Sequence, residues 1–109
     1  MLIDEAYFEY VDDPTYGTAI PEAVKNPRLL VSRTFSKVYG MAGIRAGYAI
    51  GHPETIRRLQ PWRTPSGISA FAAAAAMASL EATDHVERQR ALNRQVRTFS
   101  MNVMKELGF

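Results

Sequence analysis

Residues 34–48, TFSKVYGMAGIRAGY, gather hydroxyl groups, one lysine, one arginine and three glycines into a short stretch. An arginine fork offers a phosphate dianion bidentate, charge-assisted hydrogen bonds, and serine or threonine hydroxyl groups add short donors. Lys37 lies within this stretch. A cationic side chain nearby lowers the pKa of a lysine and so favours its neutral form. Only the neutral amine is a nucleophile, so such a lysine is suited to attack an aldehyde. The stretch therefore indicates a phosphate-binding site with a lysine that forms a Schiff base.

A second small cluster lies near the N-terminus, where Asp4 follows the apolar residues 2–3 and Tyr7 comes three positions later. The apolar pair predicts the end of a strand, and ligands of open α/β sheets bind beyond the carboxyl ends of strands. A carboxylate there can keep a pyridine nitrogen protonated, and a phenol can hydrogen-bond a neighbouring ring oxygen. The two clusters thus predict binding groups for the two ends of one cofactor.

Together the two clusters resemble the signature of fold-type I pyridoxal-phosphate-dependent aminotransferases of class I and II, most closely the histidinol-phosphate aminotransferase branch, over nearly the whole chain. A D-x-x-Y unit of that family matches DEAY, which begins at Asp4 and ends at Tyr7. The family's S-K followed by G-x-A-G-x-R-x-G-Y matches SK at residues 36–37 and GMAGIRAGY at residues 40–48.

The resemblance implies a role for each matching residue. Lys37 is expected to be the catalytic residue and to bind pyridoxal 5'-phosphate covalently. The phosphate group is expected to contact the two hydroxyl residues and the arginine, and the ring is expected to contact the aspartate and the tyrosine. The cofactor-binding residues implied in this way are Asp4, Tyr7, Thr34, Ser36, Lys37 and Arg45.

Plainer interpretations exist for single residues. Alone, Lys37 could be a solvated surface lysine, Arg45 a structural ion-pair partner and Asp4 a turn cap. The long pattern in which Lys37 precedes Arg45 by eight positions, with glycines between, favours the functional interpretation. Glu5 is expected to be solvated. No role is assigned to three other residues that attract attention by type, which are His52, Trp62 and His85.

Apolar runs and turn residues predict strands in alternation with helices. Strands are expected at residues 2–3, 28–31 and 46–50, and helices at residues 21–25, 54–60, 68–82 and from 84 to a stop at Gly108. The alanine-rich helix at 68–82 is expected to pack closely on both sides, and Asp84 with Glu87 to form a capping box. Such alternation indicates an α/β architecture with a mainly parallel sheet.

The resemblance extends this architecture to a domain assignment. It implies that residues 1–83 are the C-terminal part of a large pyridoxal-phosphate-binding domain, a three-layer αβα structure. Residues 84–109 would form a long helix leading to a small C-terminal domain. The chain is therefore expected to be a fragment, because the family's remaining cofactor contacts and its substrate-binding arginine have no match here.

Composition excludes several other classes of protein. The net charge is only +2, with basic and acidic residues interspersed, so nucleic acid is not an expected partner. The chain has no cysteine, which fits a reducing compartment, and cytoplasm is expected. The acidic start lacks the character of a signal peptide, and the alanine-rich residues 70–78 are too few to cross a bilayer, so no membrane association is expected.

The expected function is transamination of an amino acid or amino-alcohol phosphate, foremost histidinol phosphate with 2-oxoglutarate, as a step of histidine biosynthesis. The partners expected are a small-molecule amino donor, a 2-oxo acid and, in the full-length enzyme, a second copy of the chain in a homodimer. Two alternatives stay open. One is a pyridoxal-phosphate-dependent amino-acid-phosphate decarboxylase on the same scaffold, and the other is a non-catalytic fragment.

Overall fold

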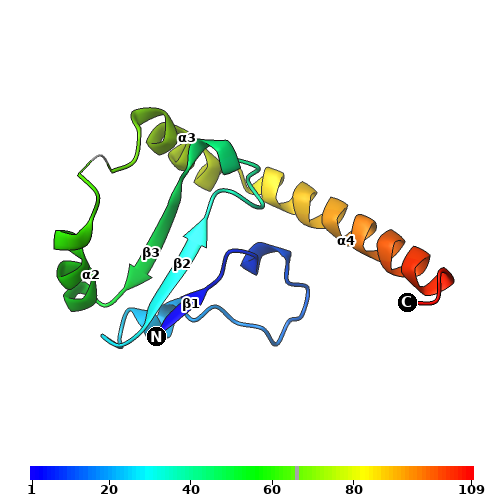
Figure 1. The fold of residues 1–109 in the computed structure, drawn as a ribbon, viewed down its shortest axis with the longest axis horizontal. Coiled ribbons are helices and arrows are strands. Elements are labelled where there is room, and N and C mark those ends of the chain that lie inside the picture. Colours follow the sequence, from blue (N-terminus) through cyan, green and yellow to red (C-terminus); the bar gives the residue numbers. More distant parts are fainter. Residues whose placement is uncertain (66) are drawn as a thin grey trace.

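The chain folds around a three-stranded sheet in the order β1-β2-β3 (Figure 1). The computed structural model describes residues 1–65 and 67–109. Strand β1 (Leu2–Asp4) pairs in parallel with β2 (Leu30–Thr34), and β2 pairs antiparallel with β3 (Gly47–Gly51). The predicted α/β class is confirmed, but only one of these two pairings is parallel. β3 turns back because residues 35–46 contain no crossover helix, which a parallel return normally needs.

The predicted helices are all present, with shifted boundaries. They are α1 (Ile20–Ala23), α2 (Pro53–Leu59), α3 (Ala70–Glu81) and α4 (Thr83–Glu106). Pro61 does not simply stop the second helix, because it lies within a 3₁₀ turn, Gln60–Trp62, that continues the chain from α2. The predicted loop at residues 61–67 includes residue 66, which lies outside the described residues.

The predicted capping box of α4 is wrong. The helix begins one residue earlier, and its N-cap is Ala82, which has no side chain able to accept a hydrogen bond from the first turn. In contrast, Ser69 caps α3 by accepting a bond from the N–H of Ala72 at 3.1 Å. The sequence pattern located both helices but identified the wrong residue at the start of the second.

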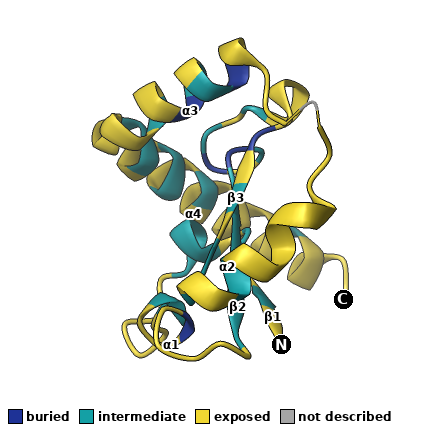
Figure 2. Cartoon of the chain, turned by 90° about the vertical axis from the view of Figure 1, so that its left-hand side faces the viewer, coloured by how far each residue is buried: buried dark blue, intermediate teal, exposed yellow. Residues whose placement is uncertain are grey.

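A small hydrophobic core lies between α3 and the loop that follows β2. It consists of Phe35, Ala46, Ala72 and Ala76, with Tyr39, Met41 and Tyr48 packed against it. The ring of Phe35 lies 5.2 Å from that of Tyr39 and 5.5 Å from that of Tyr48, measured between centroids. The expectation that this helix packs on both sides is not met within this chain, because Phe71 is 88% exposed. Much of α3 is coloured as exposed in Figure 2.

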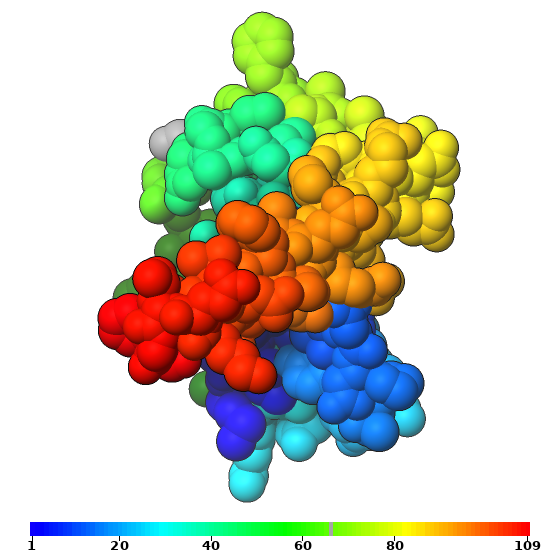
Figure 3. Space-filling view, turned by 90° about the vertical axis from the view of Figure 1, so that its right-hand side faces the viewer, coloured from blue at the N-terminus to red at the C-terminus, as the bar shows by residue number. Residues whose placement is uncertain are grey.

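Helix α4 lies against the N-terminal segment, which is blue beside the orange part of the helix in Figure 3. Arg94 donates a hydrogen bond to Asp12 at 2.8 Å, and Arg97 donates to the other oxygen of the same carboxylate. These bonds from Arg94 and Arg97 lower the pKa of Asp12 to about 2. Arg90 adds a bond to the carbonyl oxygen of Val11 at 3.3 Å. Three arginines of one helix thus attach it to a single short segment.

Candidate cofactor site

The carboxyl ends of β1 and β2 lie side by side and carry the first of the predicted site residues. Asp4 is paired with Ser32 in the parallel register. Its Oδ1 accepts hydrogen bonds from the Ser32 hydroxyl group at 2.9 Å and from the N–H of Ala6 at 3.2 Å. The side chain is exposed beyond the strand. Its carboxylate is therefore held in one orientation and remains accessible.

The end of β2 presents the two predicted hydroxyl residues in a tight turn. Thr34 Oγ1 accepts a hydrogen bond from the N–H of Ser36 at 3.1 Å and donates to the carbonyl oxygen of Ala46 at 3.4 Å. The turn places Ser36 and the following lysine beyond the strand end. Thr34 therefore also caps the turn that follows it.

Lys37 and Tyr7, predicted from separate clusters, lie together in the structure. The Lys37 Nζ is 4.9 Å from the centroid of the Tyr7 ring. Both side chains are exposed, and Tyr7 has 59% of its surface accessible. A cationic amine over a phenol ring is a favourable contact even at an exposed position. This contact joins the turn after β2, which carries Lys37, to the turn after β1, which carries Tyr7.

Arg45 has an unusual backbone conformation just before β3. Its φ of 61° and ψ of 54° place it in the left-handed region, and it is the only residue other than glycine with positive φ within residues 1–65 and 67–109. Such a conformation costs about 1–3 kcal/mol and persists where the surroundings determine it. The guanidinium donates to the carbonyl oxygen of Ala42 at 2.7 Å. The structure thus directs Arg45 to its own loop and not to Thr34 or Ser36.

Gly47 allows the loop that carries Arg45 to lie close to the carboxyl end of β2. It is paired with Thr34, and a Cβ added at Gly47 would lie only 3.0 Å from the carbonyl oxygen of Arg33. A larger residue would push β3 away from β2 at this point. The glycine therefore keeps Arg45, two positions earlier, close to the turn that carries the hydroxyl residues.

Sequence reasoning missed Glu5, which was expected to be solvated. The residue is only 2% exposed, and its carboxylate accepts hydrogen bonds from Arg33 at 2.7 and 2.9 Å. A signal was present in the sequence, because Arg33 directly precedes Thr34 at the end of a buried strand. A buried guanidinium requires an anionic partner nearby.

His85 has a structural contact that was not predicted. Its Nε2 lies 3.0 Å from the carbonyl oxygen of Val38, and its ring stacks on Tyr39 at 6.5 Å between centroids. Val38 directly follows the lysine. The start of α4 therefore supports the back of the lysine turn.

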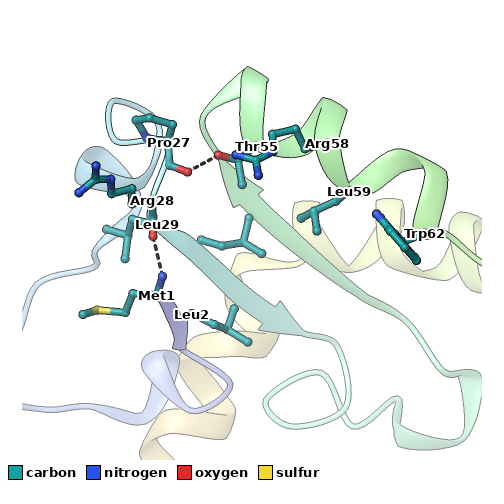
Figure 4. Close-up of a pocket in the computed structure, with 10 residues that line it drawn as sticks. Met1, Leu2, Pro27, Arg28, Leu29, Thr55, Arg58, Leu59 and Trp62 are labelled. Atoms are coloured by element: carbon teal, nitrogen blue, oxygen red, sulfur yellow. Dashed lines mark hydrogen bonds between the residues drawn. The ribbon is translucent and has the colours of Figure 1, made fainter.

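A cavity of about 510 Å³ lies at the opposite end of the strands, beside Met1 and Trp62 (Figure 4). The amino group of Met1 donates to the carbonyl oxygen of Arg28 at 2.6 Å, and Thr55 donates to that of Pro27 at 2.6 Å. None of the predicted site residues lines this cavity. It is therefore a separate feature of the fold.

Two searches of the described residues were negative. Across residues 1–65 and 67–109, no three histidine, aspartate or glutamate side chains come together in a way that could hold a metal ion. Within the same residues, no helix has the length and apolar character needed to cross a membrane.

Comparison with known proteins identifies the family. The model of the aminotransferase class I and II family matches residues 1–109. The chain belongs to this family. Solved aminotransferase chains superpose on it with TM-scores from 0.75 to 0.91. The fold is therefore that of the fold-type I aminotransferases.

Two curated aminotransferases illustrate how the family divides by substrate. Histidinol-phosphate aminotransferase 1 of Cupriavidus pinatubonensis is 41% identical over 108 residues, which are 99% of this chain and 29% of the relative. The aromatic amino acid aminotransferase of Mycobacterium avium is also 41% identical, over 109 residues, which are 100% of this chain and 31% of the relative. The chain thus spans less than a third of the length of these relatives.

A solved aminotransferase with its cofactor is also similar. The histidinol-phosphate aminotransferase of Sinorhizobium meliloti, in complex with pyridoxal-5'-phosphate, superposes with a TM-score of 0.75 and 33% identity, covering 83% of this chain and 24% of that one. The residues of this chain fit such a group in their chemistry. An oriented, accessible carboxylate, a phenol, two hydroxyl groups and an amine lie at adjoining strand ends.

Proposed function

We propose that the full-length protein carrying this chain is a pyridoxal-phosphate-dependent aminotransferase that moves an amino group from histidinol phosphate to 2-oxoglutarate. The observation that carries the proposal is the contact of Lys37 with Tyr7, where the turns after β1 and β2 meet. The similarity to histidinol-phosphate aminotransferases supports the choice of substrate. The proposal includes a homodimer, which the family resemblance implies, and the cytoplasmic location expected of a cysteine-free chain.

The chain supplies groups for both ends of the cofactor. The Asp4 carboxylate would pair with the pyridine nitrogen, and the Tyr7 hydroxyl group would donate to the ring oxygen. Thr34, Ser36 and Arg45 would hold the phosphate. When bound, pyridoxal phosphate withdraws electrons from the bonds at the substrate Cα. Arg45 would have to leave the carbonyl oxygen of its own loop to take part.

Lys37 would have two tasks in the reaction. Its Nζ would attach the cofactor in the resting enzyme, and after the substrate amine has displaced it, the free amine would act as the base at the substrate Cα. An exposed lysine at a turn is suited to both tasks, and the Nζ of Lys37 lies over the face of the Tyr7 ring. The backbone of the turn stays fixed by Thr34 while the amine moves.

A second candidate is transamination of aromatic amino acids. The observation in its favour is that the Mycobacterium avium relative, named for that substrate class, is as similar to the chain as the Cupriavidus relative. The decarboxylase alternative shares the same lysine and differs only in its product.

A product assay with the full-length protein tests this proposal. The protein, loaded with pyridoxal phosphate, is incubated with 2-oxoglutarate and with histidinol phosphate, phenylalanine or O-phosphothreonine, an amino-acid phosphate whose carboxyl group a decarboxylase would release, and glutamate and carbon dioxide are measured. We expect glutamate from histidinol phosphate at a kcat/KM at least about tenfold above that for phenylalanine, a difference of about 1.4 kcal/mol in transition-state binding. The reverse preference would favour the aromatic candidate. Carbon dioxide without glutamate would contradict transamination.

We expect Asp4→Asn to slow the reaction roughly 10- to 150-fold, because a hydrogen bond to a charged partner contributes about 1.5–3 kcal/mol. The fold should be preserved, since an asparagine Oδ1 can still accept the bonds from Ser32 and Ala6. Steady-state kinetics and circular dichroism measure the two effects. Asp13→Asn, which changes a carboxylate bonded only within its own turn to Thr15, is the matched control. Equal rates for the Asp4 variant and the control would show that Asp4 is only a turn residue.

A further inference from the structure

A buried ion pair lies directly behind the strand ends that carry the candidate site. Glu5 follows Asp4, and its carboxylate Oε2 accepts bonds from Arg33 Nε at 2.9 Å and Nη2 at 2.7 Å. The same carboxylate accepts bonds from the Thr18 hydroxyl group at 2.8 Å and the N–H of Ala19 at 2.7 Å. We call these two charged residues the Glu5–Arg33 pair. It connects the end of β1, the end of β2 and the segment before α1.

Arg33 also reaches the turn that follows Tyr7. Its Nη1 donates to Glu9 Oε1 at 3.2 Å, and its guanidinium carbon lies 4.1 Å from the centroid of the Phe8 ring. The side chains of Arg33 and Glu9 are only 11% and 13% exposed. One guanidinium therefore fixes the strand β2 to the turn that begins beside Tyr7.

The Glu5 carboxylate remains charged in this environment. Burial by itself raises the pKa of Glu5, but the hydrogen bonds from Ala19 and Thr18 and the Arg33 guanidinium outweigh it, so the pKa lies below its ordinary value. The pair is thus ionic, with its bonds concentrated on one planar guanidinium. A lysine cannot reproduce this arrangement, because a single ammonium group does not span two carboxylates and a ring face.

The members of the pair alternate with residues of the candidate site along the chain. Glu5 is next to Asp4, and Arg33 is next to Thr34. Arg33 and Thr34 are successive residues of β2, so their side chains point to opposite faces. Glu5 follows the last residue of β1, and its N–H continues the pairing with β2 by donating to the carbonyl oxygen of Ser32 at 2.9 Å. The pair can therefore set the spacing of site residues without occupying the space that a ligand needs.

We propose that the Glu5–Arg33 pair is a positioning device for the cofactor site, which fixes Asp4, Tyr7 and Thr34 relative to one another. The inference rests on the proposed function, because the spacing matters only if one group bridges these residues. Its physical basis is that one guanidinium bonds both Glu5, at the end of β1, and Glu9, in the turn after Tyr7, and so connects these two segments to β2.

The test measures the dissociation constant of pyridoxal phosphate for the cofactor-free, full-length protein by fluorescence quenching. Arg33→Lys keeps the charge and loses the planar fork. A triple variant, Glu5→Gln and Glu9→Gln with Arg33→Met, removes the guanidinium together with both carboxylates bonded to it, so none of the three groups leaves a charge without its partner, and it is expected to fold even if the single variant does not. In each variant that folds by circular dichroism, we expect the dissociation constant to rise roughly 10- to 100-fold, the usual effect of removing an outer partner of a bound group.

The matched control is Asp12→Asn, which disrupts the ion pairs between the N-terminal segment and α4 away from the site. It should change the dissociation constant by less than about twofold, and in the pair variants kcat should fall more than KM for the amino donor rises. Pair variants that bind the cofactor as tightly as the unmodified protein would overturn the inference alone. An unmodified protein that binds no cofactor would overturn the proposed function, and the inference with it.

Discussion

Replacing Lys37 with alanine is expected to lower turnover of the full-length protein by a factor of at least about 10³, the largest effect of any single substitution at the site. The change removes the amine that attaches the cofactor and the base that moves the proton at the substrate Cα. The fold should be unaffected, because Lys37 is exposed and its contact in the structure is with the exposed ring of Tyr7. Steady-state kinetics with saturating cofactor and substrate measure the loss.

Lys25→Ala is a suitable control for this experiment, since Lys25 is another exposed lysine and lies after α1, outside the candidate site. It should retain the full rate. The Lys37 variant should still bind pyridoxal phosphate weakly through the residues that hold its ring and phosphate. Turnover within about tenfold of the unmodified protein would show that the catalytic lysine lies elsewhere.

The second large effect concerns residues 1–109 expressed alone, which are expected to show no transaminase activity even with excess cofactor. The chain spans about 30% of the length of its relatives, and the family resemblance implies that a substrate-binding arginine and further cofactor contacts lie outside it. Incubation with pyridoxal phosphate, histidinol phosphate and 2-oxoglutarate, followed by a glutamate assay, measures the activity directly.

The isolated chain is also expected to associate with itself or to pack loosely. Its radius of gyration is 16.9 Å, whereas a compact domain of this length has about 13 Å. Large apolar side chains are exposed on both long helices, among them Phe71, Met77, Phe99 and Met101. Size-exclusion chromatography and binding of a hydrophobic dye would detect either behaviour. A monomeric, dye-free chain with glutamate formation at the rate of an intact aminotransferase would contradict both expectations.

The sequence identified the candidate site more readily than the contacts that support it. Lys37 and Arg45 stand in a long motif whose residue types follow from phosphate and amine chemistry. Glu5 stands in no such motif, because a glutamate beside a turn is normally solvated; Arg33 indicates that an anionic partner is needed, but only the fold shows that this partner is Glu5. Residues that contact a ligand can stand together in a local sequence motif. Residues that pair across different strands are far apart in the sequence, so no local motif reveals them.

The same distinction explains the errors in the fold. Helix positions followed from periodicity, but the direction of β3 depends on how the 35–46 connection folds, and apolar residues in a strand do not specify a direction. The capping box at Asp84 and Glu87 had the right residue types, yet α3 and α4 are separated only by Ala82, so the second helix begins too early to use it. The exposure of Phe71 depends on which other segments pack against α3, and the local sequence does not specify them.

Chemical trapping can show directly whether Lys37 holds the cofactor. Borohydride treatment of the full-length protein loaded with pyridoxal phosphate converts the linkage between aldehyde and amine into a stable secondary amine. Protease digestion and mass spectrometry then locate the added mass. We predict that it lies on the peptide containing Lys37 and is absent from the Lys37→Ala variant. Labelling at a different lysine, or no labelling of the unmodified protein, would contradict the account.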